Sequence, residues 1–338
     1  MTSPDLELGA SEVRILRSAG LVSARRYLSA LDAVRDEAFW LRWGRHALLA
    51  LGVGQFLAGV VFFFAYNWND LSDIAKFAIV ESALVIAAAG ACLVGLDRAF
   101  GQVLLIAASV LTGVLLAVIG QVYQTGADAF ELVAAWALLI LPWAFVSRSA
   151  VHWLLWLAVA ETALALYGVQ ALTVVGDVTR GDVWGLVGTT IIAALIAREI
   201  GVRKGLDWLA AHWTRLILLF AALAVLFAPA SAHAIDLEDL GSGPLSIGVF
   251  VLATLGAGAI YWRVKPDFAA LVIVIGFGDL FFVCIGYRVI DEAIGFDLKE
   301  VAPALTSLGA MIAWAIAGTG SAGFAMRHLR GTVRGAIA

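Results

Sequence analysis

The sequence contains few charged residues. Asp, Glu, Lys and Arg make up 14% of its 338 residues, whereas hydrophobic residues make up 62%. Average soluble proteins contain about a quarter charged residues. A soluble core cannot absorb such an apolar excess, because most residues of any globule face water somewhere. We therefore expect lipid to surround most of the chain. The net charge of −4, with no basic domain, gives no indication of a nucleic-acid partner.

Cysteine and histidine are scarce as well. Both cysteines, Cys92 and Cys284, fall inside apolar runs, which is typical of small buried side chains and not of a disulfide framework. The five histidines are scattered, and none pairs with another at the spacing of metal ligands. The sequence thus predicts no metal and no cofactor, and it offers no catalytic residue.

Long apolar runs dominate the chain and predict an all-α, polytopic transmembrane helix bundle. A spanning helix needs about 17 to 25 mostly apolar residues. Short breaks rich in charge, Gly or Asn separate the runs. The sequence predicts about ten spans: 47–66, 74–95, 101–121, 130–146, 151–172, 183–200, 212–231, 244–262, 267–288 and 302–325.

The first 45 residues differ from the rest. Apolar residues at helical spacing form one face over 27–41, and Gly20 marks a turn before it. We expect a cytoplasmic amphipathic helical hairpin over 1–45, then the bundle over 46–330 and a cytoplasmic tail over 331–338. The apolar face of residues 10–45 either packs on itself, lies on the membrane or binds a cytoplasmic partner.

Positive charge predicts the orientation. With the N-terminus in the cytoplasm, eighteen of the 22 Lys and Arg residues fall on the cytoplasmic side, as the positive-inside rule requires. An even number of spans returns the C-terminus to the cytoplasm. Tryptophans gather near the expected membrane interfaces: Trp40, Trp43, Trp143, Trp153, Trp208, Trp213 and Trp262 inside, and Trp68 and Trp184 outside. The prediction is a multi-pass protein of the inner (plasma) membrane.

Three carboxylates lie within predicted spans. Glu161 and Asp279 are near mid-membrane, and Glu81 is about two turns from an outer end. A charged carboxylate at mid-membrane costs about 2.5–3.5 kcal/mol on insertion scales, so such residues usually face other helices or a cavity. They serve either an ion or ligand path or, protonated, helix packing alone.

Amide, acidic and aromatic residues gather at the expected extracytoplasmic face. The segments Tyr66–Asp73 and Gly120–Asp128 both emerge there. Such groups suit sugars, lipid head groups and other polar uncharged ligands. We expect Asn67-Trp68 to meet the Gln121 face in a shared vestibule, although separately solvated loops are the alternative. The candidate ligand-binding residues are Asn67, Trp68, Asp70, Lys76, Gln121, Tyr123, Gln124, Asp128 and Trp136.

Two stretches carry a family resemblance. "FLAGVVFFFAYNWNDLSDIAKFA" and "GVLLAVIGQVYQTGADAFELVAAWALL" resemble DUF2157, a bacterial membrane family with Asn-Trp after the first span and Gly-Gln-x-Tyr ending the third. Residues 10 to about 170 carry the resemblance. Asn69 stands where the family pattern has Asp, and Asp70 follows. The resemblance implies a class of membrane protein and no particular reaction.

Three functions fit these features. A transporter or permease-like protein for a small polar solute fits the spans, the carboxylates and the glycine-interrupted helices. A membrane enzyme acting on a lipid-linked envelope substrate would use Asp70, Asp73 or Asp128, but the outer loops are short. A non-catalytic sensor or assembly factor would couple the outer face to the N-terminal hairpin. The first is our best hypothesis.

The orientation is testable with reporter fusions. Fusions at residues 70, 125 and 238 are expected to report an extracytoplasmic location, and those at 98, 148 and 204 a cytoplasmic one, because of the positive-inside bias. A C-terminal fusion that reports outside would require an odd number of spans and contradict the topology.

Overall fold

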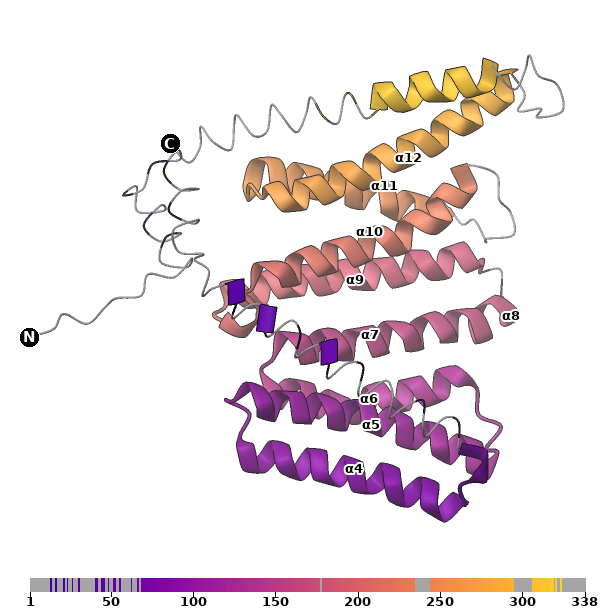
Figure 1. Ribbon diagram of the computed structural model, residues 1–338. Helices are drawn as coiled ribbons and strands as arrows, with labels where there is room; N and C mark the ends of the chain where they lie inside the picture. Colours follow the sequence, from indigo (N-terminus) through magenta and orange to yellow (C-terminus); the bar gives the residue numbers. More distant parts are fainter. Residues whose placement is uncertain are drawn as a thin grey trace, which may run out of the picture. The chain divides into compact units, whose positions relative to one another are not determined.

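The computed structural model describes residues 68–176, 178–234, 244–294 and 306–318, with isolated residues before 68 and residues 320 and 323. The predicted span 47–66 and the N-terminal hairpin lie for the most part outside the described residues. The chain divides into two compact units, Met1–Lys76 and Phe77–Ala338. Figure 1 traces the helices.

The described residues are helical and include no strand. The elements are η1 (Trp68–Asp70), α4 (Asp73–Val94), α5 (Ala99–Tyr123), α6 (Ala129–Ser147), α7 (Ala150–Tyr167), η2 (Gly168–Leu172), α8 (Thr173–Val175), α9 (Arg180–Arg203), η3 (Asp207–Leu209), α10 (His212–Ala234), α11 (Pro244–Ala259), η5 (Ile260–Val264) and α12 (Phe268–Ile294).

Eight helices of the described part are long and apolar enough to cross a membrane: Asp73–Val94, Ala99–Tyr123, Ala129–Ser147, Ala150–Val175, Arg180–Arg203, His212–Ala232, Leu245–Val264 and Phe268–Ala293. They correspond to the second through ninth predicted spans. Where the tenth was predicted, the described helix Thr306–Gly318 is apolar but shorter. The all-helical class is confirmed, and the total of about ten spans stays a prediction.

In the second unit the chain doubles back at each loop, so that successive helices lie side by side (Figure 1). We call the helix ends where α5 stops and α6 starts the Gln121 end, and the opposite ends, at the α6–α7 turn, the Arg148 end. Helix α5 stays helical through Tyr123, slightly beyond the predicted Gln121. Gln124 then adopts φ 46° and Gly126 φ 65°. This left-handed backbone, which favours Gly, turns the chain out of the helix.

Two apolar clusters pack between the helices of this unit. The larger one joins α9, α10, α11 and α12 around the fully buried Leu223, Leu226 and Phe250. A smaller one joins α6 and α7 through Ala137, Ile140 and Val159. Many large apolar side chains elsewhere on these helices are exposed, such as Leu93 at 87% and Leu138 at 70%. Such exposure suits a surface in contact with lipid.

Polar groups within the helices bond across helix interfaces. The Trp136 indole N–H donates to the Ser109 carbonyl at 2.7 Å, which joins α6 to α5. The Ser109 hydroxyl and His152 Nε2, both fully buried, lie 2.8 Å apart and join α5 to α7. Because these groups lie between packed helices, each such bond removes the cost of one unsatisfied polar group.

The contact between α5 and α6 predicts a pair of contrasting glycine variants. A Cβ at Gly113 would approach Trp136 Cε2 to 2.5 Å, whereas a Cβ at Gly120 would meet only atoms at 3.9 Å or beyond. Gly113→Ala is therefore expected to lose about 1–3 kcal/mol of stability through overpacking. Gly120→Ala, the control on the same helix, is expected to be neutral or stabilising. Thermal unfolding in detergent measures both, and equal melting temperatures would contradict this packing.

Candidate functional site

Two of the predicted ligand-binding residues, Trp68 and Lys76, lie next to each other. Trp68 lies in the turn η1 and is half-buried, and Lys76 Nζ lies 5.4 Å from the centre of its ring. The same ammonium lies 3.3 Å from Asp73 Oδ1. Cation–π and ionic attraction thus hold Lys76, whose side chain is only 12% exposed. Asp70 is exposed, and Asn67 lies outside the described residues.

A pocket opens at the Gln121 end, where α5 stops and α6 starts. Its volume is about 660 Å³, and its polar lining comprises Gln121, Gln124, Thr125, Asp128 and Glu131. Three of the predicted binding residues, Gln121, Gln124 and Asp128, thus lie around one space. Asp128 occupies the N-cap position of α6 without capping the helix through its side chain. Its carboxylate is therefore available to a ligand in the pocket.

The local geometry follows from the sequence. The left-handed Gln124 and Gly126 stop α5, and the next residues bring Asp128 and Glu131 back beside it. Gln170 Oε1 accepts the Phe130 backbone N–H at 3.1 Å, which fixes the start of α6 against η2. The pocket can offer amide donors and acceptors beside two carboxylates, a set that binds hydroxyl-rich or amine-bearing ligands.

Two predicted aromatic residues lie elsewhere. Tyr123, 69% exposed, packs its ring 6.0 Å from that of Phe77. Trp136 lies about two turns into α6, where its indole bonds to Ser109. It thus supports the α5–α6 contact beneath the pocket. The shared vestibule of Asn67 with Gln121 stays a prediction.

The three intramembrane carboxylates differ in their surroundings. Glu161, on α7, accepts a hydrogen bond from the Thr190 hydroxyl of α9 at 2.7 Å. A Cβ at Gly318 would lie 2.6 Å from Asp279 Oδ1, so Asp279 faces the helix Thr306–Gly318. Both orientations agree with the expected inward direction, and Gly318 is a point of close helix approach, as its small size predicts. Glu81 is exposed.

An ion-pair cluster that the sequence did not predict lies at the Arg148 end. Arg215 of α10 donates to both oxygens of Glu199, at 2.8 and 3.3 Å, and to Asp267 Oδ2 at 2.7 Å. Lys265 binds Glu199 at 2.8 Å, and His212 Nε2 lies 2.7 Å from Asp267 Oδ2. These contacts tie α9, α10 and the turn before α12 together.

A second arginine extends this cluster. Arg198, 4% exposed, pairs with Glu199 and donates to the Thr214 hydroxyl at 3.1 Å and to the Ala211 carbonyl at 3.0 Å. Buried charges cost free energy unless their partners are complete, and here each guanidinium has several. The only sequence signal was the excess of Lys and Arg on the expected cytoplasmic side, which predicted orientation and not pairing.

Asp267 lies between two spanning helices, and its pKa reflects the cluster. Burial raises the pKa, but hydrogen bonds from Arg215, His212 and the Ala270 backbone N–H outweigh burial. The pKa therefore lies below its ordinary value of 3.8. Asp267 stays ionised near neutral pH and caps the start of α12 through Ala270.

The cluster predicts a pH-dependent loss of stability. Asp267→Asn is expected to cost about 1–3 kcal/mol at neutral pH, because it leaves Arg215 short of one charged acceptor. A carboxylate with a lowered pKa stabilises the folded state above its unfolded pKa, and this contribution is lost as pH falls through the folded pKa. The difference in melting temperature between the wild type and the variant should therefore disappear in acid, below pH 3.8.

Asp207→Asn is the matched control, since Asp207 is an exposed acid at the same helix ends. We expect it to change stability by no more than about 0.5 kcal/mol. A difference in melting temperature for Asp267→Asn that persists unchanged into acid would rule out the ionised carboxylate as its source.

Comparison with known proteins bears on the first half of the chain. No curated protein and no solved structure matches the sequence. One family model does match, over residues 14–153, and its description is a predicted membrane protein. The matched part holds Trp68, Lys76 and the whole Gln121-end pocket, whereas the ion-pair cluster lies beyond it. The resemblance drawn from the sequence is thereby confirmed: over residues 14–153 the chain matches the DUF2157 family of predicted membrane proteins.

Proposed function

We propose that the protein is a permease-like protein of the inner membrane, and that it binds a small polar solute in the pocket at its Gln121 end. The observation that carries the proposal is the convergence of Gln121, Gln124, Thr125, Asp128 and Glu131 on one space of about 660 Å³. That volume lies within the range of about 300–1,000 Å³ typical of small-molecule sites.

Charge distribution supports an extracytoplasmic position for this pocket. Within the described ranges, the Arg148 end carries Arg98, Arg148, Arg198, Arg203, Lys204, Arg215, Arg263 and Lys265. The Gln121 end of the same unit carries only Arg180 and Arg288, against Asp128, Glu131, Asp182, Asp291 and Glu292. By the positive-inside rule we infer that the Arg148 end faces the cytoplasm, the side on which the sequence predicts both termini.

The chemistry of the lining favours an uncharged or cationic solute. Two carboxylates accept hydrogen bonds from hydroxyl or ammonium groups, and the two glutamines can donate or accept. An anionic solute would meet Asp128 and Glu131 with like charge and without a neighbouring cation in the pocket lining. Sugars, polyols and zwitterionic head-group fragments are the classes that fit.

Transport is supported less directly, by Glu161 and Asp279. Both lie within spanning helices at helix–helix contacts, where carboxylates commonly mark solute or proton paths. Thermal-shift screening of monosaccharides, polyols and amino acids with the full chain in detergent identifies a ligand. Uptake of that ligand into proteoliposomes then separates a permease from a protein that only binds.

Two substitutions link the ligand to the pocket. Gln121→Leu and Asp128→Ala are expected to weaken binding about tenfold each, since each removes a hydrogen-bonding group from a polar site. Asp97→Ala, an exposed acid in the α4–α5 turn at the opposite end, is the control and should leave affinity unchanged. If all three variants bind the ligand as tightly as the wild type, the pocket is not the binding site.

A further inference from the structure

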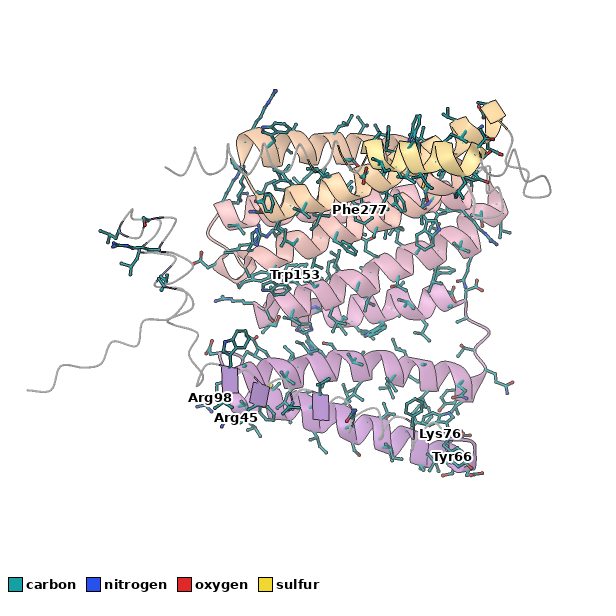
Figure 2. The ribbon with its side chains drawn as sticks, turned by 45° about the horizontal axis from the view of Figure 1, so that its top comes forward. Arg45, Tyr66, Lys76, Arg98, Trp153 and Phe277 are labelled. Atoms are coloured by element: carbon teal, nitrogen blue, oxygen red, sulfur yellow. The ribbon has the colours of Figure 1, made fainter. Side chains whose placement is uncertain are left out.

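A second pocket, at the Arg148 end, differs from the first in chemistry. It has a volume of about 600 Å³ and lies between the α6–α7 turn, α9, η3 and the start of α10. Its wall is aromatic and aliphatic and includes Trp153, Trp156, Trp208, Leu154, Leu157 and Leu218. Trp153, labelled in Figure 2, contacts three other rings of this region.

The rings form a rigid wall. Trp153 stacks on Trp208 with centroids 6.1 Å apart and an interplanar angle of 22°. Trp156 meets Trp153 edge to face at 5.0 Å, and its own indole N–H is bonded to the Ala137 carbonyl. The pocket is therefore largely pre-formed, which lowers the cost of binding a flexible apolar chain.

The two arginines in the pocket lining have different surroundings. Arg198 is buried, and its guanidinium is already bonded to Glu199, Thr214 and Ala211. Arg148 is exposed and forms no ion pair within the described part of the chain. Arg148 is thus the lining arginine that remains without an ion pair among the described residues.

Trp153 supplies a second polar group. Its indole N–H is buried and has no acceptor among the described residues. An unsatisfied buried donor is costly and usually has a partner. Trp153 lies in the first turn of α7, about 5 Å along the helix from its start, whereas Arg148 precedes that start. An anion at Arg148 and a hydrogen-bond acceptor about one turn deeper would satisfy both groups.

We propose that this pocket is a binding site for an anionic diacyl phospholipid. The phosphate pairs with Arg148, an ester carbonyl accepts the Trp153 N–H, and one acyl chain lies against Trp156, Trp208 and Leu218. Arg148, Trp153 and Trp156 follow one another from the start of α7 inward, as phosphate, ester and acyl chain do from the surface of a bilayer. Basic pockets between helices on the cytoplasmic side are typical sites for anionic head groups. The proposal rests on the orientation given under the proposed function, but not on ligand binding at the Gln121 end.

Native mass spectrometry of the full chain in detergent tests the proposal. The probes are phosphatidylglycerol, phosphatidylcholine with the same acyl chains, and a phosphatidylglycerol with ether-linked chains. The wild type is expected to retain ester-linked phosphatidylglycerol most tightly. Arg148→Gln should weaken that binding about fivefold or more, because one Lys or Arg near an anionic head group strengthens binding by about that factor.

The matched control is Arg98→Gln, because Arg98 is an exposed arginine at the same end and lines none of the described pockets. Trp153→Phe removes the N–H but also puts a smaller ring in place of the indole, so the preference for the ester-linked over the ether-linked lipid is the diagnostic readout. We expect it to weaken binding of the ester-linked lipid about threefold and to abolish the preference over the ether-linked lipid, whose linkage lacks the carbonyl.

Three results would overturn the proposal. Equal retention of phosphatidylglycerol and phosphatidylcholine by the wild type would show non-specific lipid contact. An unchanged affinity in Arg148→Gln would remove the anion site. Displacement of the lipid by glycerol phosphate at comparable concentration would identify a soluble anion as the occupant and not a lipid.

Discussion

The structure depends on one constraint: within an apolar solvent, a polar group on a helix is costly unless it finds a hydrogen-bond partner, and here many of these partners lie on a neighbouring helix. The indoles of Trp136, Trp156 and Trp314 all donate to backbone carbonyls of neighbouring helices. Thr190 bonds to Glu161 across the α7–α9 contact. Because apolar side chains gain little by leaving lipid for one another, these directional bonds and close glycine contacts decide which helix faces meet.

The same constraint explains why charge is concentrated at helix ends. The cluster of Arg198, Arg215, Glu199, Lys265 and Asp267 lies where α9 and α10 meet the turn before α12. Each guanidinium there has at least one carboxylate and further acceptors, so the cost of partial burial is offset by complete pairing. The cluster fixes the Arg148 end of the most tightly packed helices, while the Gln121 end has no comparable set of ion pairs within the described residues.

Hydropathy placed the eight described spans well, because twenty apolar residues in a row have few alternatives to a spanning helix. The end of α5 was placed within two residues by the same apolar run, although the left-handed residue that caps the helix is Gln124 and not a glycine. Pairing across helices did not follow from the sequence. Glu199 and Lys265 are 66 residues apart, and Trp136 was assigned to the outer face although its indole bonds to α5. A sequence gives the depth of a residue in the membrane, but not which neighbouring helix it faces.

The two pockets differ in how far apart their lining residues are in the sequence. Gln121, Gln124 and Asp128 were predicted together because they follow one another at one helix end, and a single turn brings them around one space. The lining of the other pocket comes from α6, α7, α9, η3 and α10, so no short stretch of sequence predicts it. Trp153 and Trp208 were predicted only as members of an interfacial belt, 55 residues apart in the chain, yet they stack on each other. A tryptophan of the belt whose N–H has no acceptor among the described residues, beside an arginine without an ion pair in the same ranges, therefore carries information about binding that the position of the belt alone does not.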